Sequence, residues 1–238
     1  METILEYKEL IRSFTAKYVG KFKELLKTNK KLKIKVIVAC SILCTVTLLI
    51  AFYGIYQEID RINRNGFEFK LMDDKSGYIV IDYNGGETSV VIPSEYRGKP
   101  VKEVWCLGKF ENLVHVTIPN TVIAIRHNTD RYCTSLQSVT FEENSQLQYI
   151  GGVVFGGSLI ESIVIPDTVT HIDKLAFTTC VNLKSIFIPS TVVTMGFNVF
   201  PHCDSLSAIY CEAEEKPEGW DLEWNLYDIP VVWGYVSE

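Results

Sequence analysis

The amino-acid sequence predicts a mainly β solenoid, in which short parallel strands form one curved sheet, preceded by an N-terminal helix and one transmembrane helix. Three observations predict this architecture. Apolar residues recur every 23 or 24 positions in the C-terminal half, residues 36–56 carry no charge, and the charge balance changes sign along the chain. These features divide the 238 residues into a basic N-terminal segment, an uncharged stretch suited to lipid and an acidic region that contains the repeats.

The charge distribution separates a basic N-terminal segment from an acidic remainder. Residues 1–35 contain ten Lys or Arg and four Glu, a balance of +6. Taking these from the chain totals of 23 basic and 29 acidic residues leaves 13 basic and 25 acidic residues downstream, a balance of −12. Nucleic-acid binding requires clustered Lys and Arg, so the acidic remainder predicts no nucleic-acid partner.

The uncharged stretch at residues 36–56 predicts a transmembrane helix. Its 21 residues read VIVACSILCTVTLLIAFYGIY. At about 1.5 Å per residue the helix would span roughly 31 Å, which matches a hydrocarbon core of about 30 Å. Tyr53 and Tyr56 lie where interfacial aromatic side chains are expected. A cleaved signal peptide has a shorter apolar region and a shorter basic region before it, so we expect a retained anchor.

The basic segment predicts the orientation of this anchor. The positive-inside rule places residues 1–35 in the cytoplasm and residues 57–238 outside the cell, which makes the chain a single-pass membrane protein. Apolar side chains recur at helical spacing in residues 1–35, and Lys residues occupy much of the remaining surface. A basic amphipathic helix of this kind suits anionic lipid or a partner helix. Lipid is favoured, because aromatic side chains dominate the apolar face.

Internal repeats make up the exported part. A first apolar anchor recurs at spacings of 23, 24, 23 and 23 residues, and a second anchor follows each one three residues later. The first anchors are Leu113, Leu136, Ile160, Leu183 and Leu206. Each pair marks a short strand, and a proline such as Pro189 ends it because proline cannot donate to a sheet ladder. One unit cannot bury its own apolar face, so the units are expected to stack around a continuous core.

These repeats resemble the BspA-like class of leucine-rich repeats, whose pattern reads L-x-x-I-x-I-P-x-x-V-x-x-I with a closing A-F. Residues 160–177 carry the whole pattern, and residues 183–200 carry it with Met and Val-Phe at the last positions. The resemblance covers roughly residues 67–238. It implies a leucine-rich-repeat domain with an N-terminal capping unit at about 67–105 and a C-terminal cap at about 209–238.

Two stretches depart from the pattern. Residues 124–133 lack the Ala-Phe signature, and Phe141-Glu142 replaces the Ile-Pro pair. We expect altered turn geometry at both places within an intact solenoid. Residues 57–66, ahead of the domain, are predicted to be a linker.

The resemblance also implies a function. Such proteins are bacterial cell-surface proteins of adhesion and protein–protein contact without catalytic activity of their own, and the tail is similar to the terminal unit common in Gram-positive bacteria. The expected partner is therefore a protein or a surface component that the sequence does not name. Three alternatives stay open: a signalling or accessory subunit that relays an external contact, an enzyme with an unrecognised site, and a structural spacer.

The sequence predicts no catalytic, cofactor or metal site. It contains no C-x-x-C pair and no Cys/His cluster at zinc spacing. Its four histidines occupy different repeat positions, and none lies in a recognised nucleophile context. Cys133, Cys180 and Cys203 share one repeat position, which predicts a ladder of small buried side chains at a turn.

Side chains that flank the second anchor of each strand point away from the core. They form two columns, one mainly small and polar, the other apolar toward its C-terminal end. The predicted protein-binding face consists of His115, Thr117, Ser138, Thr140, Ser162, Val164, Ser185, Phe187 and Tyr210. The alternative is that these side chains only cover neighbouring coils.

Overall fold

The fold is described from a computed structural model, which defines residues 43, 45–54, 66–105, 107–110, 112–126 and 132–236. The chain divides into two units, Met1–Asp60 and Arg61–Glu238. Each unit is described by itself.

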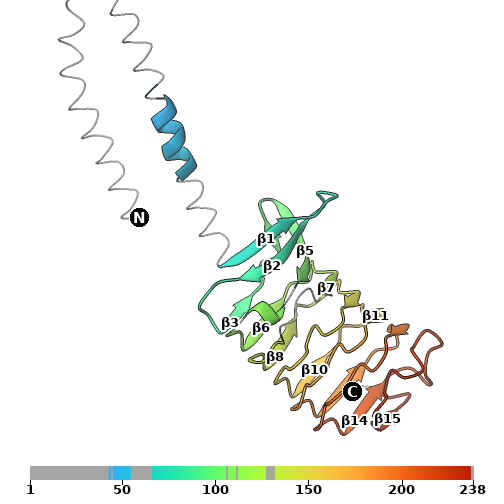
Figure 1. The fold of residues 1–238 in the computed structure, drawn as a ribbon. Helices are drawn as coiled ribbons and strands as arrows, with labels where there is room; N and C mark the ends of the chain where they lie inside the picture. The colour runs from blue at the N-terminus through green and yellow to red at the C-terminus, as the bar shows by residue number, and fades with distance from the viewer. Residues whose placement is uncertain are drawn as a thin grey trace, which may run out of the picture. The chain divides into compact units, whose positions relative to one another are not determined.

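In the first unit, Leu43 and residues 45–54 are helical (Figure 1). The large apolar side chains of this segment are exposed, and Leu49 and Phe52 expose 68% and 69% of their surface. The Thr47 hydroxyl donates a hydrogen bond to the carbonyl of Leu43 at 2.9 Å, so the helix satisfies this polar group internally.

The rest of the predicted span at residues 36–56 and the predicted basic helix at residues 1–35 lie outside the described residues. Within the part of the chain that the structure describes, no helix is both long and apolar enough to cross a membrane.

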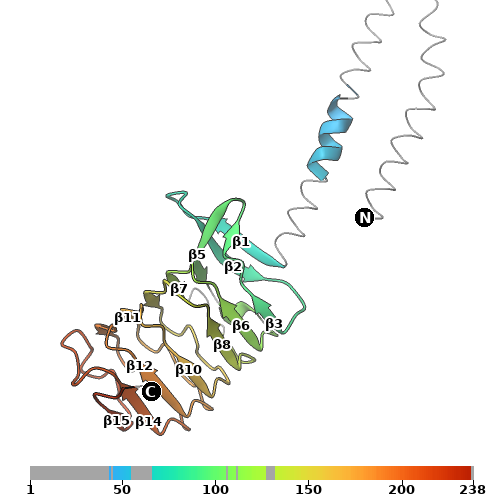
Figure 2. The same ribbon diagram turned by 180° about the vertical axis from the view of Figure 1, so that it is seen from behind.

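The second unit is a solenoid whose coils place strands on two sides of a shared core (Figures 1 and 2). Two parallel sheets follow one another along one side, with the strand orders β3-β6-β8 and β10-β12-β14-β15. These strands are β3 (Ser89–Val91), β6 (His115–Ile118), β8 (Ser138–Phe141), β10 (Ser162–Val164), β12 (Ser185–Ile188), β14 (Ala208–Cys211) and β15 (Val231–Val232).

The other side carries a third sheet in the order β1-β2-β5-β7-β9-β11-β13, with β4 paired to β5. These strands are β1 (Phe67–Leu71), β2 (Tyr78–Tyr83), β4 (Glu95–Tyr96), β5 (Lys99–Trp105), β7 (Ala124–Arg126), β9 (Tyr149–Ile150), β11 (His171–Ile172) and β13 (Thr194–Met195), and a 3-10 turn, η1 (Leu107–Lys109), follows β5. Only β1–β2 and β4–β5 are antiparallel among the described ladders.

The mainly β solenoid is confirmed, but the prediction of a single sheet is wrong. The second apolar pair of each coil also forms a short strand, as at Thr194–Met195, which pairs with His171–Ile172. The returning chain passes close to the core, so its peptide groups need partners, and the neighbouring coil supplies them. Two-residue strands are too short for an alternation pattern to reveal.

The predicted anchors form the core. The first anchors are all buried, with exposed fractions of 7% or less. Phe155, Phe177 and Phe200 stack face to face with ring centroids 5.2 and 5.5 Å apart, and Trp224 of the C-terminal cap continues the row at 6.4 Å. Stacking therefore joins the coils through one aromatic ladder.

The predicted cysteine ladder is also confirmed. The Cys133, Cys180 and Cys203 thiols are buried and donate to carbonyl oxygens of a neighbouring coil at 3.2, 3.1 and 3.0 Å. The hydrogen bond with Cys180, together with burial, raises the pKa of the Cys203 thiol. These side chains fill turns.

Candidate binding surface

The parallel ladders align the predicted face in two columns. One column runs through the first residues of the strands, with Ser89 opposite His115 and Ser138, and Ser162 opposite Ser185 and Ala208. The second column consists of Val91, Thr117, Thr140, Val164, Phe187, Tyr210 and Val232. All nine predicted residues therefore lie on one side of the solenoid, which we call the strand face.

Val91 and Val232 belong to this face and were missed by sequence reasoning. Val91 lies in the capping unit, and Val232 lies in a tail strand that carries no repeat signal. The apolar character of their short runs, SVV and PVVW, was the available signal.

The C-terminal end of the strand face is apolar and aromatic. Val164 exposes 74% of its surface and Val232 exposes 42%. Phe187 and Tyr210 are half-buried, because Tyr235 of the tail packs against both rings at centroid distances of 6.0 and 4.7 Å. The tail therefore covers part of Phe187 and Tyr210, and the three rings form one cluster.

The strand face is polar at β6 and β8, whereas exposed Val91 of β3 lies at its N-terminal end. His115 Nδ1 lies 2.7 Å from the Ser138 hydroxyl. In the C-terminal part, directly before β10 and β12, exposed Lys184 pairs with Glu161 at 2.7 Å, and such a solvated pair contributes at most about 1 kcal/mol. A surface with separate polar and apolar parts suits a partner whose contact surface is divided in the same way.

A hollow of about 570 Å³ opens in the strand face between β8 and β10. Its lining includes Thr140, Ser162 and Val164 of the predicted face. Side chains of the turn after β8 and of Pro166 and Asp167 complete it.

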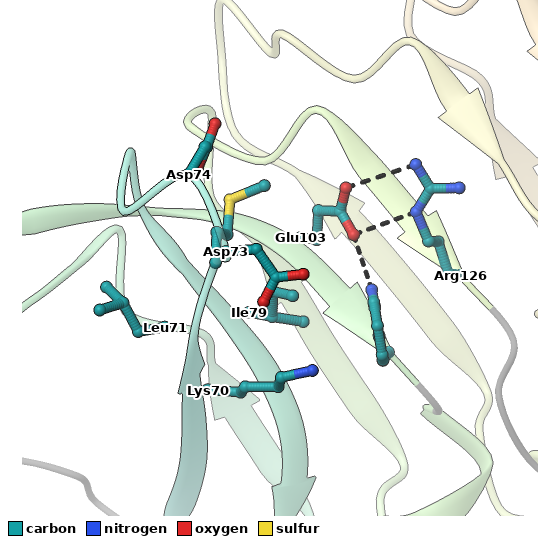
Figure 3. Close-up of a pocket in the computed structure, with 9 residues that line it drawn as sticks. Lys70, Leu71, Asp73, Asp74, Ile79, Glu103 and Arg126 are labelled. Atoms are coloured by element: carbon teal, nitrogen blue, oxygen red, sulfur yellow. Dashed lines mark hydrogen bonds and ion pairs between the residues drawn. The ribbon is translucent and has the colours of Figure 1, made fainter.

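A second pocket, of about 480 Å³, lies on the other side, at β1, β5 and β7 (Figure 3). Buried Glu103 accepts hydrogen bonds from Trp105 Nε1 at 2.7 Å and from Arg126 at 3.0 and 3.3 Å. The Lys70 ammonium lies 5.5 Å from the Trp105 ring centroid. Three donor contacts occupy the Glu103 carboxylate, so it serves as a structural anchor rather than as an available base.

A row of stacked side chains, one guanidinium group and two rings, leads away from this pocket along the sheet. The Arg126 guanidinium lies 4.9 Å from the Tyr149 ring, which stacks on His171 at 5.0 Å. The Tyr149 hydroxyl donates a hydrogen bond to the Asp173 carboxylate at 2.9 Å. Burial of the Tyr149 side chain is the main cause that raises its pKa, and the hydrogen bond to Asp173 raises it further. In the described residues no group of His, Cys, Asp or Glu is placed to hold a metal ion.

Comparison with known proteins identifies the repeats. Residues 106–216 match the family model described as a BspA type leucine rich repeat region, in six copies. Residues 106–216 are therefore similar to BspA-type leucine-rich repeats. No protein of curated function matches the chain.

Solved structures of similar fold come from several bacteria. A leucine-rich-repeat protein of T. pallidum is 28% identical, with a TM-score of 0.55, over 61% of this chain and 68% of that one. A leucine-rich-repeat protein from Bacteroides capillosus is 24% identical, with a TM-score of 0.39, over 63% of this chain and 96% of that one. The pneumococcal vaccine antigen PcpA is 20% identical, with a TM-score of 0.46, over 65% of this chain and 51% of that one. The T. pallidum protein supports the repeat assignment.

Proposed function

We propose that this protein is a membrane-anchored surface protein whose repeat domain binds another protein or a surface component through the strand face. The observation that carries the proposal is the apolar end of that face, where Val164 and Val232 stay exposed beside the cluster of Phe187, Tyr210 and Tyr235. Contiguous exposed apolar surface marks interaction sites, and aromatic side chains are frequent anchors of interfaces.

The role is one of binding without catalysis. Leucine-rich-repeat solenoids typically present an extended surface to a partner. Glu103, a buried carboxylate of the described core, is held by Arg126 and Trp105 rather than facing a nucleophile. An adhesive or scaffolding contact needs only the surface.

The membrane anchor is part of the proposal. Support comes from the 21 uncharged residues at 36–56 and from the ten basic residues that precede them. The exposed apolar side chains at residues 45–54 add to it, because a helix that is apolar all round needs lipid or a protein core around it. In this arrangement residues 1–35 contact anionic lipid in the cytoplasm and the repeat domain is extracellular.

The orientation is tested with epitope tags at the two ends of the full chain. On intact cells we expect a C-terminal tag to be stained and cut by added protease, and an N-terminal tag to be reached only after permeabilisation. Staining of the N-terminal tag on intact cells would contradict the orientation.

The binding role is tested by partner capture with the full chain in mild detergent, using surface proteins of the source cell and its neighbours. Val164→Lys places a charge in the apolar end, and Leu222→Lys makes the same change at a leucine that is 90% exposed outside the strand face. We expect Val164→Lys to weaken capture by roughly tenfold or more, because a buried unpaired charge costs over about 1.4 kcal/mol. Leu222→Lys should capture as wild type, and equal capture by both variants would contradict the proposal.

A further inference from the structure

The ladder of strands on the strand face is interrupted once within the described chain. Consecutive coils pair β3 with β6, β6 with β8, β10 with β12 and β12 with β14, but no ladder joins β8 to β10. On the other side β9 pairs with both β7 and β11, so the same two coils remain stacked there. The hollow lies at this interruption.

A longer turn accompanies the interruption. Six positions separate Phe141 from the next core residue, Leu147, whereas four separate the equivalent residues in other coils, as from Ile188 to Val192. Regular turns are closed by a bond from a valine N–H to a proline carbonyl, as between Val192 and Pro189 at 3.1 Å. The longer turn has no proline.

Hydrogen bonds hold this turn toward the preceding coil. The Glu142 carboxylate accepts a bond from the N–H of Asn120 at 3.1 Å, and the N–H of Gln146 donates to the carbonyl of Asn120 at 3.0 Å. Asn144 takes the left-handed conformation that the tight bend requires, with φ of 57°. These bonds tie the turn after β8 to the coil that contains β6.

Core-facing surface becomes accessible in the hollow. Val139 and Phe141 are half-buried, whereas their counterparts one coil earlier, Val116 and Ile118, are only 2% and 1% exposed. The same core positions that close the other coils thus line an opening here. An apolar side chain entering the hollow would meet this surface.

Main-chain groups of both β8 and β10 also face the hollow. The N–H groups of Ser138 and Glu142 donate to carbonyl oxygens of the coil that contains β6 at 3.1 and 3.0 Å. Because peptide groups alternate in direction along a strand, the N–H and C=O groups of Val139 and Phe141 point toward β10. The Glu161 carbonyl accepts from Lys184 on the β12 side at 3.0 Å. By the same alternation, the peptide groups of Ser162 and Val164 point toward β8, with which β10 forms no ladder in the described chain.

We propose that the hollow is the anchor pocket of the strand face and takes an extended peptide segment of the partner, with one apolar side chain inserted between β8 and β10. This inference rests on the proposed function. An extended main chain supplies the donors and acceptors that open strand edges lack. Glu142 and Asp167 at the rim give a negative local charge, so a basic residue two positions from the apolar one fits best.

The first test uses a defined peptide with the full chain in detergent. The probe is a fluorescent heptapeptide, Thr-Lys-Thr-Leu-Thr-Lys-Thr, and its control has Gly at the centre. We expect the leucine peptide to bind roughly tenfold to a hundredfold more tightly, because burying one leucine side chain is worth that ratio. Equal binding of the two peptides, or no binding at millimolar concentration, would overturn the proposal.

Two variants and a matched control locate the binding. In the first, Glu142→Pro with Glu143 and Asn144 deleted restores the regular turn length and should close the hollow. In the second, Thr140→Trp fills the hollow from an exposed position, and Thr117→Trp makes the same change at the paired residue one coil earlier. We expect the first two to lose peptide binding and Thr117→Trp to keep it. Retained binding in Thr140→Trp would place the peptide elsewhere and refute the pocket.

Partner capture separates this inference from the proposed function. If Thr140→Trp captures partners as wild type while Val164→Lys does not, the pocket is refuted and the strand face stands. If neither change affects capture, the strand face itself is refuted. Loss of both capture and peptide binding in Thr140→Trp supports the pocket.

Discussion

The coil that contains β8 and the coils that contain β12 and β14 follow the same anchor pattern, yet β8 pairs with a neighbouring strand on one side only, whereas β12 and β14 pair on both sides. All of them bury the first anchor and stack on the same core. They differ in the turn after the strand, which is short and closed at Pro189 but two residues longer after Phe141. The comparison teaches that anchors build the core, whereas turn length decides whether neighbouring strands pair.

The largest expected effect comes from removing one aromatic ring in each region. Phe177 is 1% exposed between two stacked rings, so Phe177→Ala should lower the free energy of unfolding by about 3–5 kcal/mol. Phe141 already faces the hollow, so Phe141→Ala should cost only about 1–2 kcal/mol. Urea unfolding of both variants measures the difference. Equal losses would mean that the coil around β8 is as well packed as the others.

A polar version of the comparison gives an intermediate effect. Glu103→Ala leaves the Trp105 N–H and the Arg126 guanidinium without their acceptor and should cost about 1–3 kcal/mol. Glu161→Ala breaks an ion pair whose side chains are 65% exposed and should cost under about 1 kcal/mol. The same urea series tests both variants, and a larger loss for Glu161→Ala would contradict the structural role given to Glu103.

The smallest expected effect concerns coil corners. Val153 has a φ of 59°, which a β-branched side chain adopts at a cost, and Asn198 occupies the equivalent corner two coils later. Val153→Asn should raise the free energy of unfolding by about 0.5–1 kcal/mol through relief of backbone strain. The loss of buried valine surface reduces this gain. Val193→Asn, at an exposed valine outside these left-handed corners, is the control and should give no gain. A thermal melt that shows loss in Val153→Asn would contradict this reading of the corners.

Much of the solenoid was predictable because its core repeats. The anchor register at Leu183 and Ile186 specified the strands of the strand face. The spacing of Phe155, Phe177 and Phe200 indicates one aromatic side chain per coil, and the structure shows that these rings stack. The third sheet was not predicted, since strands such as Thr194–Met195 are two residues long and arise from stacking rather than from local preference.

The candidate site was predictable only in part. Alternation along each strand placed Thr140 and Val164 on the outer face. The missing proline after Phe141 predicted an altered turn, but whether that turn would lean toward one neighbouring coil depends on its bonds to Asn120, which lies 22 residues from Glu142. Tyr235 covers Phe187 from a tail without a repeat signal, so this contact also lay beyond sequence reasoning.

Amide hydrogen exchange of the full chain tests the central contrast most directly. The N–H groups of Ser162 and Val164 face the open side of β10, whereas those of Ser185 and Phe187, one coil later, lie in a ladder. We predict exchange on the order of a hundredfold faster at Ser162 and Val164, because an open edge is not protected by a partner strand. Equal protection at the four positions would show that the strand row is continuous and would contradict both the interruption and the pocket built on it.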